Sequence, residues 1–423
     1  MELRKWGPLR GEITVPGDKS ISHRAVMFGS LAKGTTEIHG FLQGADCLST
    51  ISCFEKMGIS IENRGDTVLV QGRGLHGLTR PETILDCGNS GTTTRLISGI
   101  LSGQSFEVSL TGDASIEKRP MGRIIQPLRQ MGADITGVDD KFCPLTIRPG
   151  KLHGIEYTLP VASAQLKSAI LLGGLYADTP TTVIEPAPSR DHTERMLRAL
   201  GCRVDTDGCR ITLYPPEKLT ARDVVVPADI SSAAFFLVAG AIVPNSEITI
   251  RDVGVNPTRD GVIEVLKNMG ADITLSNLRD EGEPICDITV RTSRLHGVEI
   301  GGAVIPRLID ELPVLAVAAA FAQGETVIRD AAELKVKESN RIAAMVSELS
   351  RAGADVTETE DGMIIRGGRP LHGAAFETYH DHRIAMSMAV CALACSGDSE
   401  ILDEHVVAIS YPDFFDALHR LGG

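Results

Sequence analysis

Short polar turns that each lead into an apolar stretch carry most of the candidate functional residues. The first, Pro16–Arg24, reads "PGDKSISHR" and follows the alternating stretch "GEITV". The others are "DCGNSGTTTR", "PVASAQLKS", "VPADISS", "PRLIDELP" and "YHDHR". Together the turns supply Lys19, Ser20, Arg24, Asn89, Ser90, Thr92, Ser163, Gln165, Asp310 and Arg383. Many cations, several hydroxyl and amide groups and few carboxylates suit multidentate binding of an anion.

The pair Lys19-Ser20 invites comparison with a nucleotide-binding loop. Such a loop has the pattern GxxxxGK[ST], with the lysine directly after a glycine. Here Asp18 separates Gly17 from Lys19, and an aspartate at that position would repel phosphate. No GxGxxG motif follows a predicted strand either. The spacing therefore argues against a nucleotide-binding loop.

Two further charged stretches are "EKRPM" (117–121) and "KVKESNR" (335–341). Lys337 and Arg341 are four residues apart, so a helix would present both on one face, beside Glu338. No Cys-His or Ser-His-Asp constellation accompanies them, and no cluster of histidines and cysteines has metal-ligand spacing. The pattern predicts group transfer on a polyanionic substrate by acid–base and electrostatic means, with no metal, no other cofactor and no covalent intermediate.

Each candidate also has a purely structural interpretation. Lys19 and Arg24 could be solvated residues at the start of a helix, and Asp310 could be an ordinary N-cap. The run 335–341 could be a ladder of surface salt bridges. His382 in "HDHR" could be a capping or core histidine. For Lys167 in "SAQLKSA", the functional and the structural interpretation both stay open.

The turns belong to a sixfold internal repeat. An amphipathic helix pattern that ends in glycine recurs about every 70 residues, with the glycines at Gly58, Gly132, Gly201, Gly270, Gly353 and Gly422. Each glycine suits the left-handed position that closes a helix. A marker "LHG", whose histidine we interpret as structural, keeps the same period at Leu75, Leu152, Leu295 and Leu371, and "LTARDVVVPAD" takes its place at Leu219. The repeat predicts six β-α-β-α-β-β units and an α/β fold.

Six units in 423 residues predict two domains of three units each. We place the boundary near Pro227–Asp229, with one domain at 18–227 and the other at 1–17 plus 228–423. The strand before Lys19 is assigned to the second domain because that half otherwise lacks a partner strand. All six turns precede apolar helices, whose N-termini favour anions, so symmetrical packing would let them face one cleft.

Composition restricts the partners and the compartment. The formal net charge of −13 argues against a nucleic-acid surface and against binding to an anionic membrane. The longest apolar runs, 233–243 and 312–322, are too short to cross a bilayer and predict buried helices. The first residues lack the apolar core of a signal peptide. Nine cysteines without a CxxC pair predict free thiols and a reducing, cytoplasmic location.

Seven stretches together resemble the 5-enolpyruvylshikimate-3-phosphate synthase family, the 3-phosphoshikimate 1-carboxyvinyltransferases among the enolpyruvyltransferases. They are "PGDKSISHR", "GNSGTTTR", "EKRPM", "SAQLKSA", "IPRLIDELP", "KVKESNR" and "DHRIAM", in this order over nearly the whole chain. The resemblance implies an inside-out α/β barrel in two domains of three repeats, with the ligand cleft between them. It also implies that phosphoenolpyruvate and shikimate 3-phosphate react through a tetrahedral intermediate, in the pathway to the aromatic amino acids. The herbicide glyphosate occupies the phosphoenolpyruvate site in this family.

Carried over position by position, the resemblance implies contacts to both substrates. Those to shikimate 3-phosphate would be Lys19, Ser20, Arg24, Ser163, Ala164, Gln165, Asp310 and Lys337. Those to phosphoenolpyruvate would be Lys19, Asn89, Gly91, Thr92, Arg119, Gln165, Arg341 and Arg383. Asp310 would be the base on the 5-hydroxyl group, and Glu338 with Lys19 would move the proton at the phosphoenolpyruvate methylene. His382 would stabilise the site near phosphoenolpyruvate.

Three positions depart from the pattern of many family members. Ala164 replaces a second serine, so one phosphate contact is expected from the backbone. His192 replaces a tyrosine of some members, and Arg190 could supply the cationic group found in others. Ile409 replaces a lysine that binds phosphoenolpyruvate in some members.

Two other functions fit parts of the same pattern. The related enolpyruvyltransferase that acts on UDP-N-acetylglucosamine has a cysteine in the loop that here reads "GDASIEKRPMG", without a cysteine. A non-catalytic anion-binding protein with the same fold would be favoured by loss of the carboxylates Asp310 and Glu338, and both are present. We therefore expect an enzyme that acts on the two small-molecule substrates, as a monomer.

Overall fold

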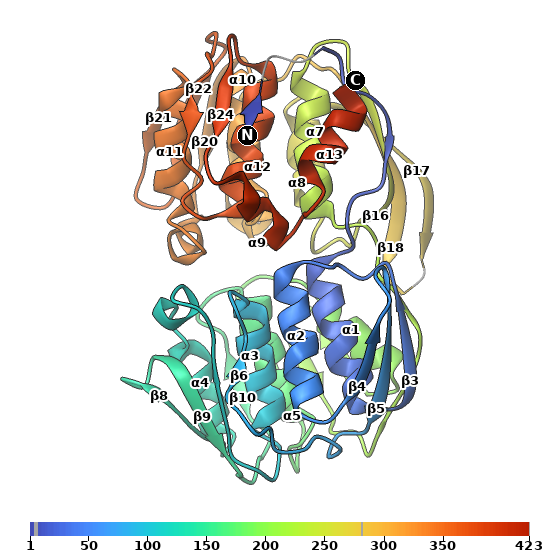
Figure 1. Cartoon of the computed structure of the whole chain (residues 1–423). Coiled ribbons are helices and arrows are strands. Elements are labelled where there is room, and N and C mark those ends of the chain that lie inside the picture. Colours follow the sequence, from blue (N-terminus) through green and yellow to red (C-terminus); the bar gives the residue numbers. More distant parts are fainter. Residues whose placement is uncertain (4–6, 281, 423) are drawn as a thin grey trace. The chain divides into compact units, whose positions relative to one another are not determined.

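The computed structural model describes residues 1–3, 7–280 and 282–422. Within them the chain forms two compact units, each described by itself (Figure 1). The continuous unit consists of Gly17–Val226, and the split unit consists of Met1–Pro16 together with Pro227–Gly423. Each unit is built around its own hydrophobic core.

The continuous unit contains three mixed sheets, ordered β14-β3-β5-β4 with β15 also on β3, β6-β7-β9-β8 and β10-β11-β13-β12. Their strands are β3 (Ala32–His39), β4 (Ser60–Asn63), β5 (Thr67–Arg73), β6 (Leu85–Asp86), β7 (Val108–Thr111), β8 (Asp134–Val138), β9 (Phe142–Arg148), β10 (Glu156–Thr158), β11 (Thr181–Ile184), β12 (Val204–Asp207), β13 (Arg210–Leu213), β14 (Leu219–Thr220) and β15 (Val224–Val225). Each sheet joins a parallel pair to an antiparallel hairpin, and the parallel pair requires a crossover helix.

The helices of this unit divide into an inner and an outer set. They are α1 (Lys19–Leu31), α2 (Ala45–Lys56), α3 (Gly91–Leu101), α4 (Gly122–Gln130), α5 (Ala164–Gly174) and α6 (His192–Ala199), with the 3₁₀ turn η1 (Ile116–Lys118). The inner helices α1, α3 and α5 are buried along almost their whole length, whereas α2, α4 and α6 alternate between buried and exposed residues. Strands such as β9 alternate in the same way, so one face of the sheet meets solvent. Apolar helices inside and sheets outside are the inside-out arrangement expected above.

The split unit repeats this architecture with sheets ordered β17-β18-β16-β2, β19-β20-β22-β21 and β1-β24-β23. Its strands are β1 (Glu2–Leu3), β2 (Arg10–Ile13), β16 (Glu247–Gly254), β17 (Asp272–Asp280), β18 (Pro284–Arg291), β19 (Glu299–Ile300), β20 (Gly324–Ile328), β21 (Asp355–Glu358), β22 (Met363–Gly367), β23 (Ala375–Phe376) and β24 (Ser399–Ile401). Its helices are α7 (Ile230–Ile242), α8 (Gly261–Asn268), α9 (Ile305–Leu308), α10 (Leu312–Phe321), α11 (Arg341–Arg351), α12 (His382–Ala394) and α13 (Phe414–Gly422), and its 3₁₀ turns are η2 (Gly302–Val304), η3 (Ala332–Val336) and η4 (Glu404–Ile409).

The predicted α/β class is confirmed, but three of the six units are not formed by one continuous β-α-β-α-β-β segment. In the first unit, the place of the first strand is filled by β14 and β15, which come from the end of this half of the chain and pair in parallel with β3. The fourth takes its leading strand from β2, which pairs in parallel with β16 as predicted for the strand before Lys19. In the sixth, β1 pairs antiparallel with β24 in the place where the other sheets have a hairpin strand. A strand need only present a complementary edge, so segments distant in sequence can fill these places.

The repeat markers close the outer helices. Gly58, Gly132, Gly201, Gly270 and Gly353 have φ between 86° and 97°, as predicted for helix-closing glycines. Gly422 is instead the last helical residue of α13 and has no positive φ, so the prediction is wrong there. In three "LHG" turns the backbone N–H of the histidine donates to the backbone carbonyl of the residue just before the helix-closing glycine, over 2.8 to 3.0 Å. These bonds support a structural role for the three turns.

The two long apolar runs form the buried helices that the sequence predicted. They are α7 and α10, whose residues are almost all buried in the core of the split unit. In the part of the chain that the structure describes, no helix combines the length and apolarity needed to cross a membrane.

Candidate functional site

Three inner helices of the continuous unit begin at capped turns. The caps are Asp18 for α1, Ser90 for α3 and Ser163 for α5, and each side chain accepts a hydrogen bond from a backbone N–H of the first turn. Gln165 donates to Thr92 Oγ1 over 3.0 Å, so the starts of α5 and α3 are adjacent. Helix starts carry N–H groups without intrahelical partners and therefore favour anions.

The start of α1 is joined to that of α3 through the side chain of Thr50. The Thr50 hydroxyl lies 2.7 Å from His23 Nδ1 on α1 and 2.7 Å from Thr93 Oγ1 on α3. His23 is fully buried, and burial lowers its pKa well below the ordinary value, with Lys19 and Arg24 adding to the effect. The imidazole is therefore neutral within this cationic turn.

Lys19 and Ser20 occupy the first two positions of α1. Lys19 Nζ lies 3.0 Å from Asp46 Oδ2 at the first turn of α2, and the lysine side chain is 18% exposed. Arg190, the residue considered above as an alternative cation, places Nη1 3.5 Å from Ser20 Oγ. This turn therefore offers an ammonium, a hydroxyl and a guanidinium group close together.

Arg24 is buried one turn further along α1. It donates from Nε to Thr193 Oγ1 over 2.7 Å, from Nη2 to Ser168 Oγ over 2.8 Å and from Nη1 to the Ser20 carbonyl over 2.9 Å. The guanidinium is thus fixed by α5, by α6 and by its own helix. The alternative of a solvated residue at a helix start is wrong for Arg24.

Two guanidinium groups converge on Gly91, the first residue of α3. A Cβ at Gly91 would lie 2.8 Å from Arg95 Nη1 and 3.0 Å from Arg119 Nη1. Arg119 Nη2 donates to Asn89 Oδ1 over 3.2 Å, and Asn89 Nδ2 donates to Asp113 over 2.7 Å. A side chain at Gly91 would displace these cations, so glycine leaves room beside them.

The start of α5 contributes Ala164 and Gln165. Ala164 is the first residue of the helix, so its N–H has no intrahelical partner. The Gln165 side chain accepts from Arg95 Nη1 over 2.6 Å while donating to Thr92. Sequence reasoning missed Arg95, although its position four residues after Gly91 on one helix face was an available signal.

In the split unit, three cations gather around the carboxylate of Asp310. Lys337 Nζ and Arg341 Nη1 each lie 3.3 Å from Asp310 Oδ1, and Arg383 Nη2 lies 4.0 Å from Oδ2. Arg383 also donates to the Asp310 carbonyl over 3.0 Å. The residue before α10 is Glu311, which makes no side-chain cap, so the N-cap interpretation of Asp310 is wrong.

Arg341 is the most enclosed member of this set, with a side chain that is 1% exposed. Its Nε lies 2.8 Å from Asp381 Oδ2, its Nη2 lies 2.6 Å from Glu338 Oε2, and Asp381 is itself fully buried. Burial alone would raise the pKa of Asp381, but the charge of Arg341 holds it below the ordinary value. Asp381 escaped sequence reasoning, and its neighbours His382 and Arg383 in "YHDHR" were the available signal.

Two expectations about the run 335–341 are wrong. Lys337 is extended between η3 and α11, and α11 begins at Arg341, so the two cations do not share a helix face. The ladder of surface salt bridges also fails, because Arg341 is buried. Lys337 and Arg341 instead both contact the carboxylate of Asp310, Lys337 from an extended stretch of backbone and Arg341 from the start of α11.

The turn before α12 supplies His382 and Arg383. Asp381 caps this helix by accepting from the Arg383 N–H over 2.9 Å, so His382 is the first helical residue and not the cap. His382 is fully buried. Glu311 Oε1 lies 3.8 Å from Arg383 Nη1 and accepts from the Ser231 hydroxyl, which ties this turn to the start of α7.

The structure also shows where His192 and Ile409, which depart from the family pattern, and Lys167 lie. His192 is the buried first residue of α6, and Ile409 is the partly buried last residue of η4. Lys167 is buried, with Glu185 and Glu194 at its ammonium group. The side chain of Lys167 is therefore too buried to contact a substrate directly, which favours the structural interpretation of this residue.

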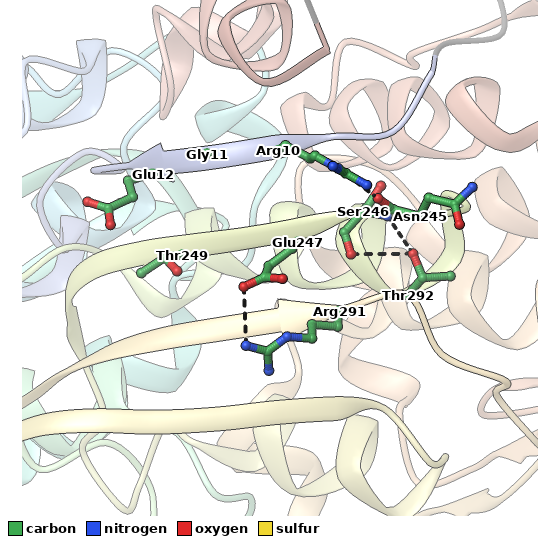
Figure 2. Close-up of a pocket in the computed structure, with 9 residues that line it drawn as sticks. All are labelled: Arg10, Gly11, Glu12, Asn245, Ser246, Glu247, Thr249, Arg291 and Thr292. Carbon is green, nitrogen blue, oxygen red and sulfur yellow. Dashed lines mark hydrogen bonds and ion pairs between the residues drawn. The ribbon is translucent and has the colours of Figure 1, made fainter.

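A separate pocket of about 500 Å³ lies on the outer sheet of the split unit (Figure 2). It is lined by Arg10, Gly11, Glu12, Asn245, Ser246, Glu247, Thr249, Arg291 and Thr292. Its carboxylates already pair with arginines, since Glu247 lies 3.2 Å from Arg291 and Glu12 lies 2.6 Å from Arg251. None of the candidate residues lines it.

Each unit therefore gathers its own set of cations and hydroxyl or carboxylate groups at or near the starts of its helices. Both sets could hold phosphate and carboxylate groups by charge-assisted hydrogen bonds. Asp310 and Glu338 could accept or donate protons, because both carboxylates remain partly exposed, at 13% and 17%.

Comparison with known proteins identifies the same relatives by sequence and by structure. The family model "EPSP synthase (3-phosphoshikimate 1-carboxyvinyltransferase)" matches residues 3–418. The chain is 57% identical to the 3-phosphoshikimate 1-carboxyvinyltransferase of Thermoanaerobacter pseudethanolicus, with 100% of each chain covered, and 58% identical to that of Geobacillus kaustophilus, with 98% of each covered. A solved EPSP synthase of Acinetobacter baumannii is 49% identical with a TM-score of 0.89, covering 99% of this chain and 97% of that chain.

Proposed function

Because this chain belongs to the EPSP synthase family, we propose that it transfers the enolpyruvyl group of phosphoenolpyruvate to the 5-hydroxyl group of shikimate 3-phosphate. The resemblance drawn from seven motifs is thereby confirmed. The structural observation that carries the proposal is the carboxylate of Asp310 with Lys337, Arg341 and Arg383 within 4.0 Å. A proton acceptor beside several anion-binding groups is what this reaction requires.

The reaction adds and then eliminates. The 5-hydroxyl oxygen bonds to C2 of phosphoenolpyruvate, its proton leaves to a base, and C3 gains a proton to become a methyl group. In the second step C3 loses a proton, the C2–O bond to phosphate breaks, and the products are the enolpyruvyl ether and inorganic phosphate. We assign Asp310 as the base on the hydroxyl group, and Glu338 with Lys19 as the groups that deliver and recover the proton at C3.

The substrate contacts that we propose are those that the family resemblance implies, and the charged sets support them. For shikimate 3-phosphate we propose Lys19, Ser20, Arg24, Ser163, Ala164, Gln165, Asp310 and Lys337. For phosphoenolpyruvate we propose Lys19, Asn89, Gly91, Thr92, Arg119, Gln165, Arg341 and Arg383. The clustering of Arg95 and Arg119 at Gly91 supports the second set, because two guanidinium groups suit a carboxylate or phosphate group. For His382, which is buried at the start of α12, we propose that it stabilises the site near phosphoenolpyruvate.

The assignment of domains and cellular setting is also a proposal. We place the domains at 18–227 and at 1–17 plus 228–423, with three repeats in each. We further propose a monomer that works in the cytoplasm without metal or organic cofactor. The free thiols of all nine cysteines are consistent with a reducing compartment.

Release of inorganic phosphate tests the reaction. We expect release that requires both phosphoenolpyruvate and shikimate 3-phosphate, with UDP-N-acetylglucosamine unable to replace the second. Release without shikimate 3-phosphate, or with the nucleotide sugar alone, would contradict the proposal. Size-exclusion chromatography with light scattering tests the monomer.

A further inference from the structure

Lys167 holds three oxygen atoms inside the continuous unit. From the first turn of α5, its Nζ lies 2.8 Å from Glu185 Oε2, 2.7 Å from Glu194 Oε1 and 3.3 Å from the Ser189 carbonyl. The side chains of Lys167, Glu185 and Glu194 are each 2% exposed. The Ser189 hydroxyl also donates to Glu185, so both ends of the carboxylate are engaged.

These contacts fix one segment at three points. Glu185 directly follows β11, Ser189 lies midway along the connection, and Glu194 lies in the first turn of α6. One ammonium group therefore ties residues 185–194 to the helix that begins with Ala164 and Gln165. Arg190 lies between the tied points.

The same two helices also hold Arg24. Its partners Ser168 and Thr193 are the residues next to Lys167 and Glu194 in the chain, and their hydroxyl groups lie 2.7 Å apart. The guanidinium groups of Arg24 and Arg190 thus both reach the start of α1, Arg24 at the Ser20 carbonyl and Arg190 at the Ser20 hydroxyl. A shift of α6 relative to α5 would move both arginines.

A buried ion cluster is weak evidence for stability, because apolar side chains of similar size often stabilise a core equally well. Its charges do, however, select one geometry, since each displaced carboxylate would be left buried without a partner. Burial would lower the pKa of Lys167, but Glu194 and Glu185 outweigh it and raise that pKa. The lysine therefore stays charged at neutral pH.

We propose that Lys167, with Glu185 and Glu194, is a positioning cluster that sets Arg190 and Arg24 for the phosphate group of shikimate 3-phosphate. The proposal rests on the proposed function for the identity of the substrate. Lys167 itself does not touch the substrate; it acts through the segment that carries Arg190 and through the hydroxyl groups that hold Arg24.

The test compares two variants with wild type. Lys167→Met alone leaves two buried carboxylates and is expected to destabilise the fold. The triple variant Lys167→Met, Glu185→Gln, Glu194→Gln removes all three charges while keeping the side-chain sizes, and is expected to fold. Lys151→Met, at an exposed lysine of the same unit, is the matched control.

For the folded triple variant we expect the Kd of shikimate 3-phosphate, measured by calorimetry, to rise about tenfold or more. The KM of phosphoenolpyruvate should change much less, and amide exchange across residues 185–192 should accelerate without any substrate present. A triple variant with unchanged Kd and unchanged exchange would overturn the proposal. If wild type failed to bind shikimate 3-phosphate, the proposed function would fall, whereas the exchange result would still decide whether the cluster fixes the segment.

Discussion

At the scale of single residues, the candidate chemistry of the split unit depends on how charge is balanced around Arg341. Three carboxylates contact this buried guanidinium, and together they outweigh burial and raise its pKa. The ion pair between Asp381 and Arg341 is fully buried. Asp310 and Glu338 face the same cation from partly exposed positions, where they can also meet a substrate.

Replacing Asp310 tests its role as the base. The amide side chain introduced by Asp310→Asn would keep the shape and could still form hydrogen bonds, but it could not take up a proton, so we expect kcat to fall about 100-fold or more. The KM values should change far less, because Lys337 and Arg341 remain. Steady-state phosphate release measures both quantities. If thermal stability and activity fell in parallel, Asp310 would have a structural role instead.

The low pKa of buried His23 predicts that the fold loses stability in acid. Its folded-state pKa lies well below the unfolded value of about 6.5, so the unfolded chain alone takes up this proton as pH falls. The contribution of neutral His23 to the free energy of unfolding is fully present above about pH 6.5. It is lost as the pH falls below that value, at up to about 1.4 kcal/mol per pH unit. Urea unfolding at a series of pH values measures it.

The His23→Asn variant isolates this contribution, because asparagine can still hydrogen-bond to Thr50 but does not titrate. We expect a shallower loss of unfolding free energy between pH 6.5 and 5 than in wild type. His153→Asn, at an exposed histidine, is the control and should leave the slope unchanged. Equal slopes in wild type and His23→Asn would refute the prediction.

At the scale of elements, the strained turn before α12 sets the candidate residues that follow it. Tyr379 and His380 have φ of 54° and 55°, a left-handed conformation that costs about 1–2 kcal/mol for each non-glycine residue. The Tyr379 hydroxyl donates to Glu348 Oε1 over 2.8 Å, and Glu348 also accepts from the Glu377 N–H over 3.0 Å. Buried Glu348 thereby holds the turn from α11.

Tyr379→Phe should release this turn in part. We expect a loss of about 1 kcal/mol in unfolding free energy, since one hydrogen bond to a charged acceptor disappears. The KM of phosphoenolpyruvate should rise, because Asp381 and Arg383 follow directly. Tyr157→Phe, on β10 of the continuous unit, should change neither quantity. An unaltered KM in Tyr379→Phe would mean that the turn does not position Arg383.

The elements also show where sequence reasoning was sufficient. Capped starts of apolar helices and closing glycines are local patterns, and five of the six glycines behaved as predicted. The extended conformation of Lys337 and the roles of Arg95 and Asp381 were missed. They depend on contacts with Asp310, Gln165 and Arg341, which lie 27 to 70 residues away in the chain.

At the scale of the whole molecule, the sheets share strands in a way that local patterns only partly predict. The strand before Lys19 was correctly assigned to the second half, where it pairs with β16, because that half lacked a partner strand. The place of β1 beside β24 was not predicted, since two residues carry no pattern of their own. The split unit is therefore completed by the first residues of the chain.

This connectivity predicts that the two units differ when expressed as fragments. Residues 17–226 contain every strand and every core residue of the continuous unit, so this fragment should fold cooperatively. Residues 227–423 lack β1, β2 and the buried side chains of Leu3, Leu9, Ile13 and Val15. Burial of four such side chains contributes roughly 6–12 kcal/mol, comparable with the whole stability of a domain, so this fragment should not fold alone.

Joining residues 1–16 to the end of 227–423 through a flexible glycine-serine linker should restore folding. The linker must be long enough for residues 1–16 to keep their neighbours in the split unit, since a Cβ on Gly11 would lie 3.6 Å from Leu421 Cδ2 of α13 and Met1 N donates to the Ile401 carbonyl over 2.9 Å. Circular dichroism during urea unfolding would show a cooperative transition for the joined fragment and none for 227–423. A cooperative transition in 227–423 alone would show that β2 and its apolar neighbours are dispensable, and the core would then have to be stabilised chiefly by the packing of α7, α10 and α12.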